Sequence, residues 1–236
     1  MITNFTHLSR SATYAVLASV TVVSLLFVGF FLSEPTIGHG QTNSNEFYIR
    51  QTITSENSFL VQPSNVTMLG TVYGVTGGNA TGSTQFVVVS NNASGYYVDI
   101  SFEHNGTEEA MIGDVSSSES IRDYDGDDGL QPGYGWTAST AAQFAYTVSA
   151  SSSGDIDASF KHNAVDTCGG GGSNTTPDLC WKAPTSSPYR IIDTIAPATT
   201  GATSSIKFKV SVPSGAVPSP TAETYTATAT LTLTSK

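Results

Sequence analysis

The segment TYTATATLTLT, residues 224–234, alternates small or apolar residues with threonines at every second position. A β-strand points successive side chains to opposite faces, so a period of two places one kind of side chain on each face. One face would carry Tyr225, Ala227, Ala229, Leu231 and Leu233. Because loose chain ends fray, we expect a terminal strand of this length to be paired along its length.

Five further segments have the β-branched and aromatic composition of strands, and several of them alternate. GYYVDISF is the clearest, with Tyr96, Val98, Ile100 and Phe102 on one face. The connection NNASG before it predicts a hairpin-type turn, with Gly95 available for positive φ. The predicted strands are residues 46–54, 83–90, 95–102, 142–150 and 205–212.

Helical periodicity is weak after residue 41. The best candidate is residues 154–163, with one or two turns capped by Asp155 or Asp157. Many short strands joined by Gly, Pro and Asn turns are typical of an antiparallel sandwich or barrel. We therefore predict an all-β fold: a single, mostly antiparallel, Ig-like (Greek-key) β-sandwich covering residues 41–236.

The N-terminal segment from Ser11 to Leu32 carries no charged residue. Its roughly twenty apolar residues are just enough to span a bilayer. Residues 1–40 are therefore either a signal peptide, cut to leave Gln41 first, or a retained membrane anchor with Arg10 on the cytoplasmic side. Both alternatives export the rest of the chain, and the membrane is a partner only through this segment if it is not cut.

Charge and cysteine usage narrow the class of protein further. The net charge is −10 and only 12% of residues are charged, about half the usual share of roughly 25%. A nucleic-acid partner is not expected, because a phosphate backbone is bound through Lys and Arg. Cys168 and Cys180 are too few for a four-ligand zinc site, so an exported chain favours a disulfide between them.

The loop RDYDGDDGLQPGYGW holds closely spaced aspartates, a pattern that suggests calcium. Asp123, Asp125 and Asp127 match the first three ligand positions of an EF-hand loop. Asp128 then stands where the turn glycine belongs, and Tyr134 where the bidentate glutamate belongs. The loop is therefore no EF-hand. It is either a solvated connection between strands or a looser calcium loop built from these four aspartates.

Catalytic signatures are missing from the sequence. It contains no Gly-x-Ser-x-Gly elbow, no His-Glu-x-x-His and no phosphate-binding glycine loop before a helix. We expect His104 and His162 to be exposed turn residues. The prediction is a non-enzymatic protein with no catalytic residues and no cofactor apart from calcium at the acidic loop.

Three stretches carry a resemblance to known proteins: residues 51–102, the CWKA after Cys180, and IKFKVSVPSG followed by TYTATATLTLTS. Together they resemble exported bacterial surface proteins with an Ig-like sandwich. A looser likeness extends to WxL-type wall-binding and TasA-type fibre proteins. Trp136 and Trp181 are not followed by x-Leu, so the wall-binding motif itself is missing. The resemblance implies the fold and an extracellular or cell-surface location.

Two functions follow as hypotheses. The first is a structural subunit or decoration of a surface fibre or envelope layer, which assembles with itself or with other surface components. In one version NSNEFYIRQTIT, residues 43–54, completes a neighbour's sheet; otherwise it is the first strand of its own domain. The alternative function is adhesion to a glycan or protein through rim aromatics: Tyr124, Tyr134, Trp136, Trp181 and Tyr189.

Overall fold

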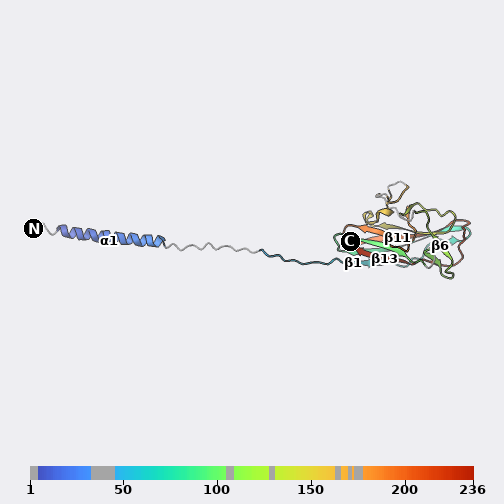
Figure 1. Ribbon diagram of the computed structural model, residues 1–236, viewed down its shortest axis with the longest axis horizontal. Coiled ribbons are helices and arrows are strands. Elements are labelled where there is room, and N and C mark those ends of the chain that lie inside the picture. Colours follow the sequence, from blue (N-terminus) through green and yellow to red (C-terminus); the bar gives the residue numbers. More distant parts are fainter. Residues whose placement is uncertain are drawn as a thin grey trace. The chain divides into compact units, whose positions relative to one another are not determined.

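A computed structural model describes residues 5–32, 46–104, 109–127, 131–162, 166–169, 172 and 178–236. Its chain divides into two units, residues 1–51 and 52–236 (Figure 1). The predicted cleavage point before Gln41, and Asp128 of the acidic loop, lie outside the described residues.

The first unit contains one helix, α1 (Phe5–Leu32). Within it, the 21 residues Ala12–Leu32 are long and apolar enough to cross a membrane. An N-terminal helix of this kind is compatible with both a signal sequence and an anchor.

The second unit is built almost entirely from strands, as predicted. The strands are β1 (Asn57–Val61), β2 (Val72–Tyr73), β3 (Gly77–Ser90), β4 (Tyr96–Phe102), β5 (Met111–Gly113), β6 (Ser120–Asp123), β7 (Gly133–Tyr134), β8 (Gln143–Ala150), β9 (Cys180–Trp181), β10 (Tyr189–Thr194), β11 (Ala198–Val212), β12 (Tyr225–Thr226) and β13 (Ala229–Ser235). Two single-turn 3₁₀ helices, Ser153–Asp155 and Ala158–Phe160, lie where one or two turns were expected, and Asp157 caps the second by accepting from the Ser159 N–H.

The strands form three sheets. The largest has eight strands in the order β1-β3-β11-β8-β6-β5-β12, with β2 also paired to β3. The second has the order β10-β4-β13, and β7 pairs with β9. Among the described ladders only β6 with β8 is parallel, where Arg122 lies opposite Gln143. The prediction of a mostly antiparallel all-β domain is therefore confirmed.

The large sheet curls into a half-barrel, so the arrangement is not clearly the two-layer sandwich that was predicted. Residues 202–212 of β11 pair without a break with residues 78–88 of β3. Strand twist accumulates over such long ladders. The pairing is also interrupted between Phe59 and Val61 and between Ala198 and Ala202, and irregularities of this kind increase local twist.

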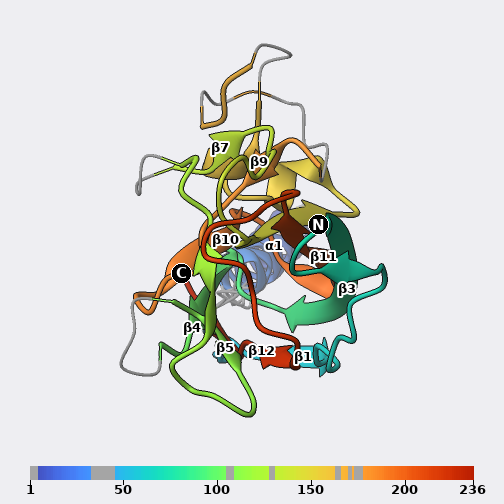
Figure 2. The same cartoon turned by 90° about the vertical axis from the view of Figure 1, so that its right-hand side faces the viewer.

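The main apolar core lies between the curled sheet and the three-stranded sheet, strands of which are labelled in Figure 2. Side chains from both sheets contribute to it and are almost fully buried: Phe86, Val98, Ile100, Tyr146, Ile192 and Ile206. At roughly 1.5 to 3 kcal/mol for each large apolar side chain, this burial is the main stabilising contribution to the domain.

The hairpin predicted between β3 and β4 is wrong. β3 pairs with β1 and β11, whereas β4 pairs with β10 and β13, so the connection passes from one sheet to the other. Gly95 does adopt a positive φ of 86°. A Cβ at this position would lie 2.0 Å from the carbonyl oxygen of Thr194, the last residue of β10. The close approach of the chain before β4 to the end of β10 therefore requires glycine.

The C-terminal run also differs from its prediction of a fully paired strand. Tyr225 and Thr226 pair with β5 in the large sheet, and residues 229–235 pair with β4 in the small one. The run therefore crosses between the sheets. In the described part of the chain, the ladder of β13 is formed with β4 alone, which leaves β13 at a sheet edge.

Candidate functional site

The segment predicted as the first strand, residues 46–54, forms neither strand nor helix. The described ladders begin only at Asn57. Phe47, Ile49 and Ile53 are 79%, 88% and 83% exposed. Their spacings of two and four residues would bring all three to one face of an extended strand. The segment therefore has the side-chain pattern of a half-buried strand while its apolar side chains face solvent.

Asn91 fixes the direction in which the chain enters β1. Its side chain accepts from the Glu56 N–H at 2.7 Å and donates to the Thr54 carbonyl at 3.2 Å. Its own N–H donates to the Glu56 carbonyl at 3.2 Å. These bonds extend the β1–β3 pairing beyond Asn57, which lies opposite Ser90. Residues 54–56 consequently continue the line of β1.

A groove of about 980 Å³ opens in the second unit. One wall is residues 63–74, which follow β1, and the other is residues 220–231 around β12 and the start of β13. Its floor is largely apolar and includes Val72, Phe144, Ile206 and Phe208. The groove therefore reaches the domain core between two segments that lie at sheet edges.

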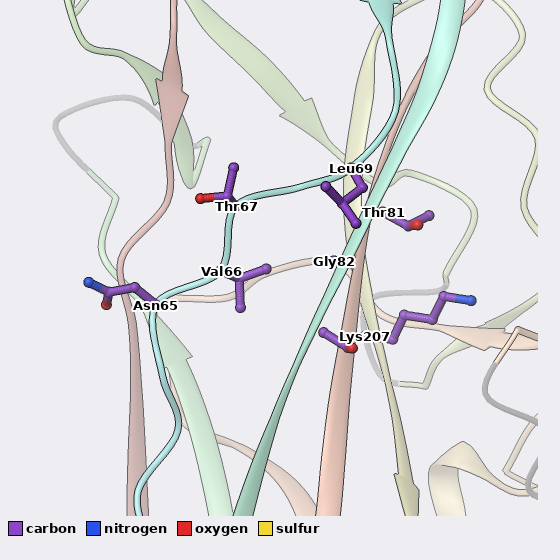
Figure 3. A pocket seen from close by; sticks show the side chains of 8 residues that line it. Asn65, Val66, Thr67, Leu69, Thr81, Gly82 and Lys207 are labelled. Carbon is purple, nitrogen blue, oxygen red and sulfur yellow. The ribbon is translucent and has the colours of Figure 1, made fainter.

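The wall formed by residues 63–69 passes very close to β3 (Figure 3). A Cβ on Gly82 would lie 2.4 Å from a methyl carbon of Val66, so glycine permits this crossing. Leu69 and Thr81 exchange backbone hydrogen bonds of 2.7 and 2.9 Å. On the outer side, these residues and Lys207 line a smaller pocket of about 390 Å³. The wall is thus fixed at both ends by β3.

Asp123, the first predicted calcium ligand, lies at the end of β6 among other polar groups. Its Oδ1 accepts from the Ala110 N–H at 3.2 Å, and its Oδ2 lies 3.7 Å from His104 Nε2. Its own N–H donates to the Glu109 carboxylate. The pKa of Asp123 is raised to about 7, mainly by burial and also by the nearby carboxylates of Glu109 and Asp127. The hydrogen bond from the Ala110 N–H acts in the opposite direction and lowers this pKa.

Asp125 and Asp127 point to other groups of the domain. Asp125 accepts a hydrogen bond from Gln143, whose Oε1 in turn accepts from the Trp136 ring N–H at 3.1 Å. Asp127 Oδ2 lies 3.0 Å from Lys182 Nζ and also accepts from the Ala183 N–H at 2.8 Å. The Lys182 and Asp127 side chains are 0% and 5% exposed, so this is a buried ion pair.

The sequence contained no signal for this pair, which joins residues 55 positions apart. Lys182 is buried because its backbone pairs with Tyr146 on the edge of β8, which draws its side chain inside. Within the described residues, no group of three His, Cys, Asp or Glu side chains is placed to hold a metal ion. Calcium binding by Asp123, Asp125, Asp127 and Asp128 stays a prediction.

Several aromatic residues suggested for ligand binding serve packing instead. Trp181 and Tyr124 are buried in a small second cluster, against which Trp136 packs. The two tryptophan rings lie 5.2 Å apart, and Lys209 Nζ lies 4.6 Å from the centre of the Trp136 ring. A ring covered in this way has little face left for a glycan.

The histidines also differ from their expected position in exposed turns. His162 is buried, and its ring lies 5.7 Å from that of Tyr134. Its backbone forms a bridge with Cys168, so the disulfide loop holds it against the domain. His104 is half-buried beside Asp123. The sequence pattern of a turn could not reveal these long-range contacts.

The cysteines lie at bonding distance, as predicted: the sulfur atoms of Cys168 and Cys180 are 2.00 Å apart. Cys180 begins β9 and is buried in the core, so the bond ties the loop to the sheet. A disulfide fits an oxidising compartment outside the cytoplasm.

Replacing both cysteines by alanine should lower the free energy of unfolding by about 3 kcal/mol, the chain-entropy cost of releasing a loop of this size. Urea unfolding of the variant and the parent measures the difference. The parent protein treated with a reductant under unfolding conditions should reach the same value. A variant as stable as the oxidised parent would show that the bond does not form.

Comparison with known proteins adds no relative. No protein-family model matches the chain, and no curated protein matches it.

Proposed function

We propose that this chain is a non-enzymatic structural subunit of a cell-surface fibre or envelope layer, and that copies join through residues 46–54. The observation that carries the proposal is the exposure of Phe47, Ile49 and Ile53 on what would be one face of a strand. Three large apolar side chains next to one another in water favour association. Addition to a sheet edge would bury them against a neighbouring copy.

The rest of the chain supports export and assembly. The apolar stretch of α1 could deliver the chain to or across a membrane, and the cysteine pair fits an oxidising environment. In this proposal the three-stranded sheet is the second layer of an open Ig-like sandwich. The segment of a neighbouring copy then supplies a strand that the domain lacks.

Replacing Phe47 and Ile49 by aspartate should abolish assembly, because burying two carboxylates in an apolar contact is strongly unfavourable. The exported protein is recovered from cells and studied by negative-stain electron microscopy and size-exclusion chromatography. The unsubstituted protein should form fibres or a series of oligomers, and the variant should be monomeric at the same concentration.

A matched control places the same two charges on the opposite face, as Tyr48→Asp with Thr52→Asp. This control should still assemble, and both variants should keep the melting temperature of the parent. A parent protein that stays monomeric at high concentration would refute the proposal. Equal loss of assembly in both variants would show that the apolar face has no special role.

A further inference from the structure

We propose that the groove between residues 63–74 and residues 220–231 is the acceptor site for residues 46–54 of a second copy of this chain. This inference rests on the proposed assembly and adds the surface that receives the segment. The incoming strand would lie along the groove, with Phe47, Ile49 and Ile53 directed into it.

The lining of the groove fits apolar side chains. Met68, Val72, Phe208 and Leu231 line it and are only partly buried, although each packs against the main core. Filling it would remove this remaining apolar surface from water, at about 25 cal/mol for each Å² buried. A strand with three large apolar side chains on one face is an occupant of matching chemistry.

The edge of β13 beside the groove is open to strand pairing. In the described part of the chain, β13 forms a ladder only with β4, and its Ala229 and Leu231 line the groove. Native sheets usually protect such edges with charged residues or proline. The sequence ATLTLTS of β13 contains neither. This edge therefore keeps backbone groups that an added strand requires.

Arg50 gives the segment a charge opposite to the one in the groove. The segment carries one cation, Arg50, and one anion, Glu46, and Glu223 is the charged residue among those that line the groove. Glu223 is held in place because it accepts hydrogen bonds from the Val115 and Ser116 N–H groups at 2.8 and 3.1 Å. Nine extended residues span roughly 30 Å.

The segment of the same chain is a poorer occupant than that of a second copy. To enter its own groove it would have to reverse direction within residues 54–56, immediately before β1. Those residues are held in line with β1 by the three hydrogen bonds of Asn91. Reversal would break them, whereas insertion into a neighbour leaves them intact.

Photo-crosslinking tests the site without assuming a register. Phe47 is replaced by benzoylphenylalanine in the full chain, and isotopically labelled and unlabelled copies are mixed before assembly. After illumination, mass spectrometry should find crosslinks between labelled and unlabelled copies, at residues 63–74 or 220–231. Crosslinks within one chain, or at other surfaces such as β10, would overturn the inference.

Electron microscopy of the same sample separates the two proposals. Fibres with crosslinks outside the groove would overturn the acceptor site and leave assembly standing. A sample that neither assembles nor crosslinks between copies would overturn both.

A second test blocks the groove with a larger side chain on one of its own lining residues. Ala227 lines it and is half-buried, so Ala227→Phe would place a ring where the incoming strand should lie. We expect at least a tenfold rise in the concentration needed for assembly. The matched control Ala196→Phe changes an exposed position outside the groove and should assemble like the parent. Equal assembly by both folded variants would overturn the acceptor site.

Discussion

Replacing Asp127 by alanine should lower the free energy of unfolding by about 3 to 5 kcal/mol, the usual cost of removing one member of a buried ion pair. Lys182 Nζ lies 3.0 Å from Asp127 and is fully buried, so the variant must bury an ammonium that has lost its carboxylate or open the structure around it. The Ala183 N–H loses its acceptor as well. Urea unfolding at neutral pH measures the loss.

Two controls show whether burial is the cause. Asp178 pairs with Lys207 but is 59% exposed, so Asp178→Ala should cost less than about 1 kcal/mol. The double variant Asp127→Leu with Lys182→Met removes both charges and should regain much of the loss, because no unpaired charge remains. If Asp127→Ala cost no more than Asp178→Ala, the pair would not be buried in solution.

Stability should also fall as the pH rises from about 4 to about 7, through Asp123. Its pKa is raised to about 7 in the folded protein from an ordinary value of 3.8, mainly by burial. Between these values the folded state keeps a proton that the unfolded state has lost, so raising the pH favours unfolding. At about 1.4 kcal/mol for each pKa unit, the ionised Asp123 side chain lowers the free energy of unfolding by about 4 kcal/mol above pH 7. Below about pH 4 this destabilisation vanishes.

The contribution of Asp123 is isolated by comparison with Asp123→Asn, since other carboxylates titrate in the same range. The asparagine side chain can still accept from the Ala110 N–H, and its amide would lie near His104, while the backbone N–H of residue 123 keeps its bond to Glu109. The variant should therefore exceed the parent in stability at pH 8, and the difference should disappear near pH 4. Unfolding is measured in the presence of a chelator, so that calcium plays no part. A constant difference across this range would contradict the raised pKa.

Strand patterns made much of the fold predictable. Alternation and β-branched runs located β3, β4, β8, β11 and most of the C-terminal run, because each of them has one face against the core. The pairing partners were not predictable in this way. The turn at Gly95 has the residues of a hairpin, but the neighbouring strands belong to different sheets. A local turn signal says nothing about which edge a strand finally meets.

Residues 46–54 show the opposite failure. Their pattern is that of a strand, and the prediction was wrong because the chain places no partner strand beside them in the described structure. An alternating pattern shows which side chains a segment could bury. It does not show whether the segment's own domain offers a surface to bury them against. The sequence also raised the alternative that the segment completes a neighbour's sheet, and this stays a proposal.

The sequence correctly predicted that the acidic loop connects strands. It did not predict which groups the carboxylates of the loop bind. Spacing along the chain suggested oxygen ligands for a cation, whereas the described structure directs Asp127 to Lys182 and Asp125 to Gln143. Both partners come from strands or strand ends distant in sequence. A cluster of like charges in a sequence does not reveal the cations and amides that the fold brings to it.

The hydrogen bonds of Asn91 have a consequence for the geometry of any polymer of this chain. They hold residues 54–56 in line with β1, whereas the groove is lined by residues 63–74 and 220–231, so in the proposed assembly the surface that gives and the surface that receives are different parts of one subunit. A contact between unlike surfaces does not close on itself as a twofold dimer does; it propagates. A fibre assembled in this way would have two distinct ends, one presenting an empty groove and the other an unused strand, and would need a separate component to stop its growth.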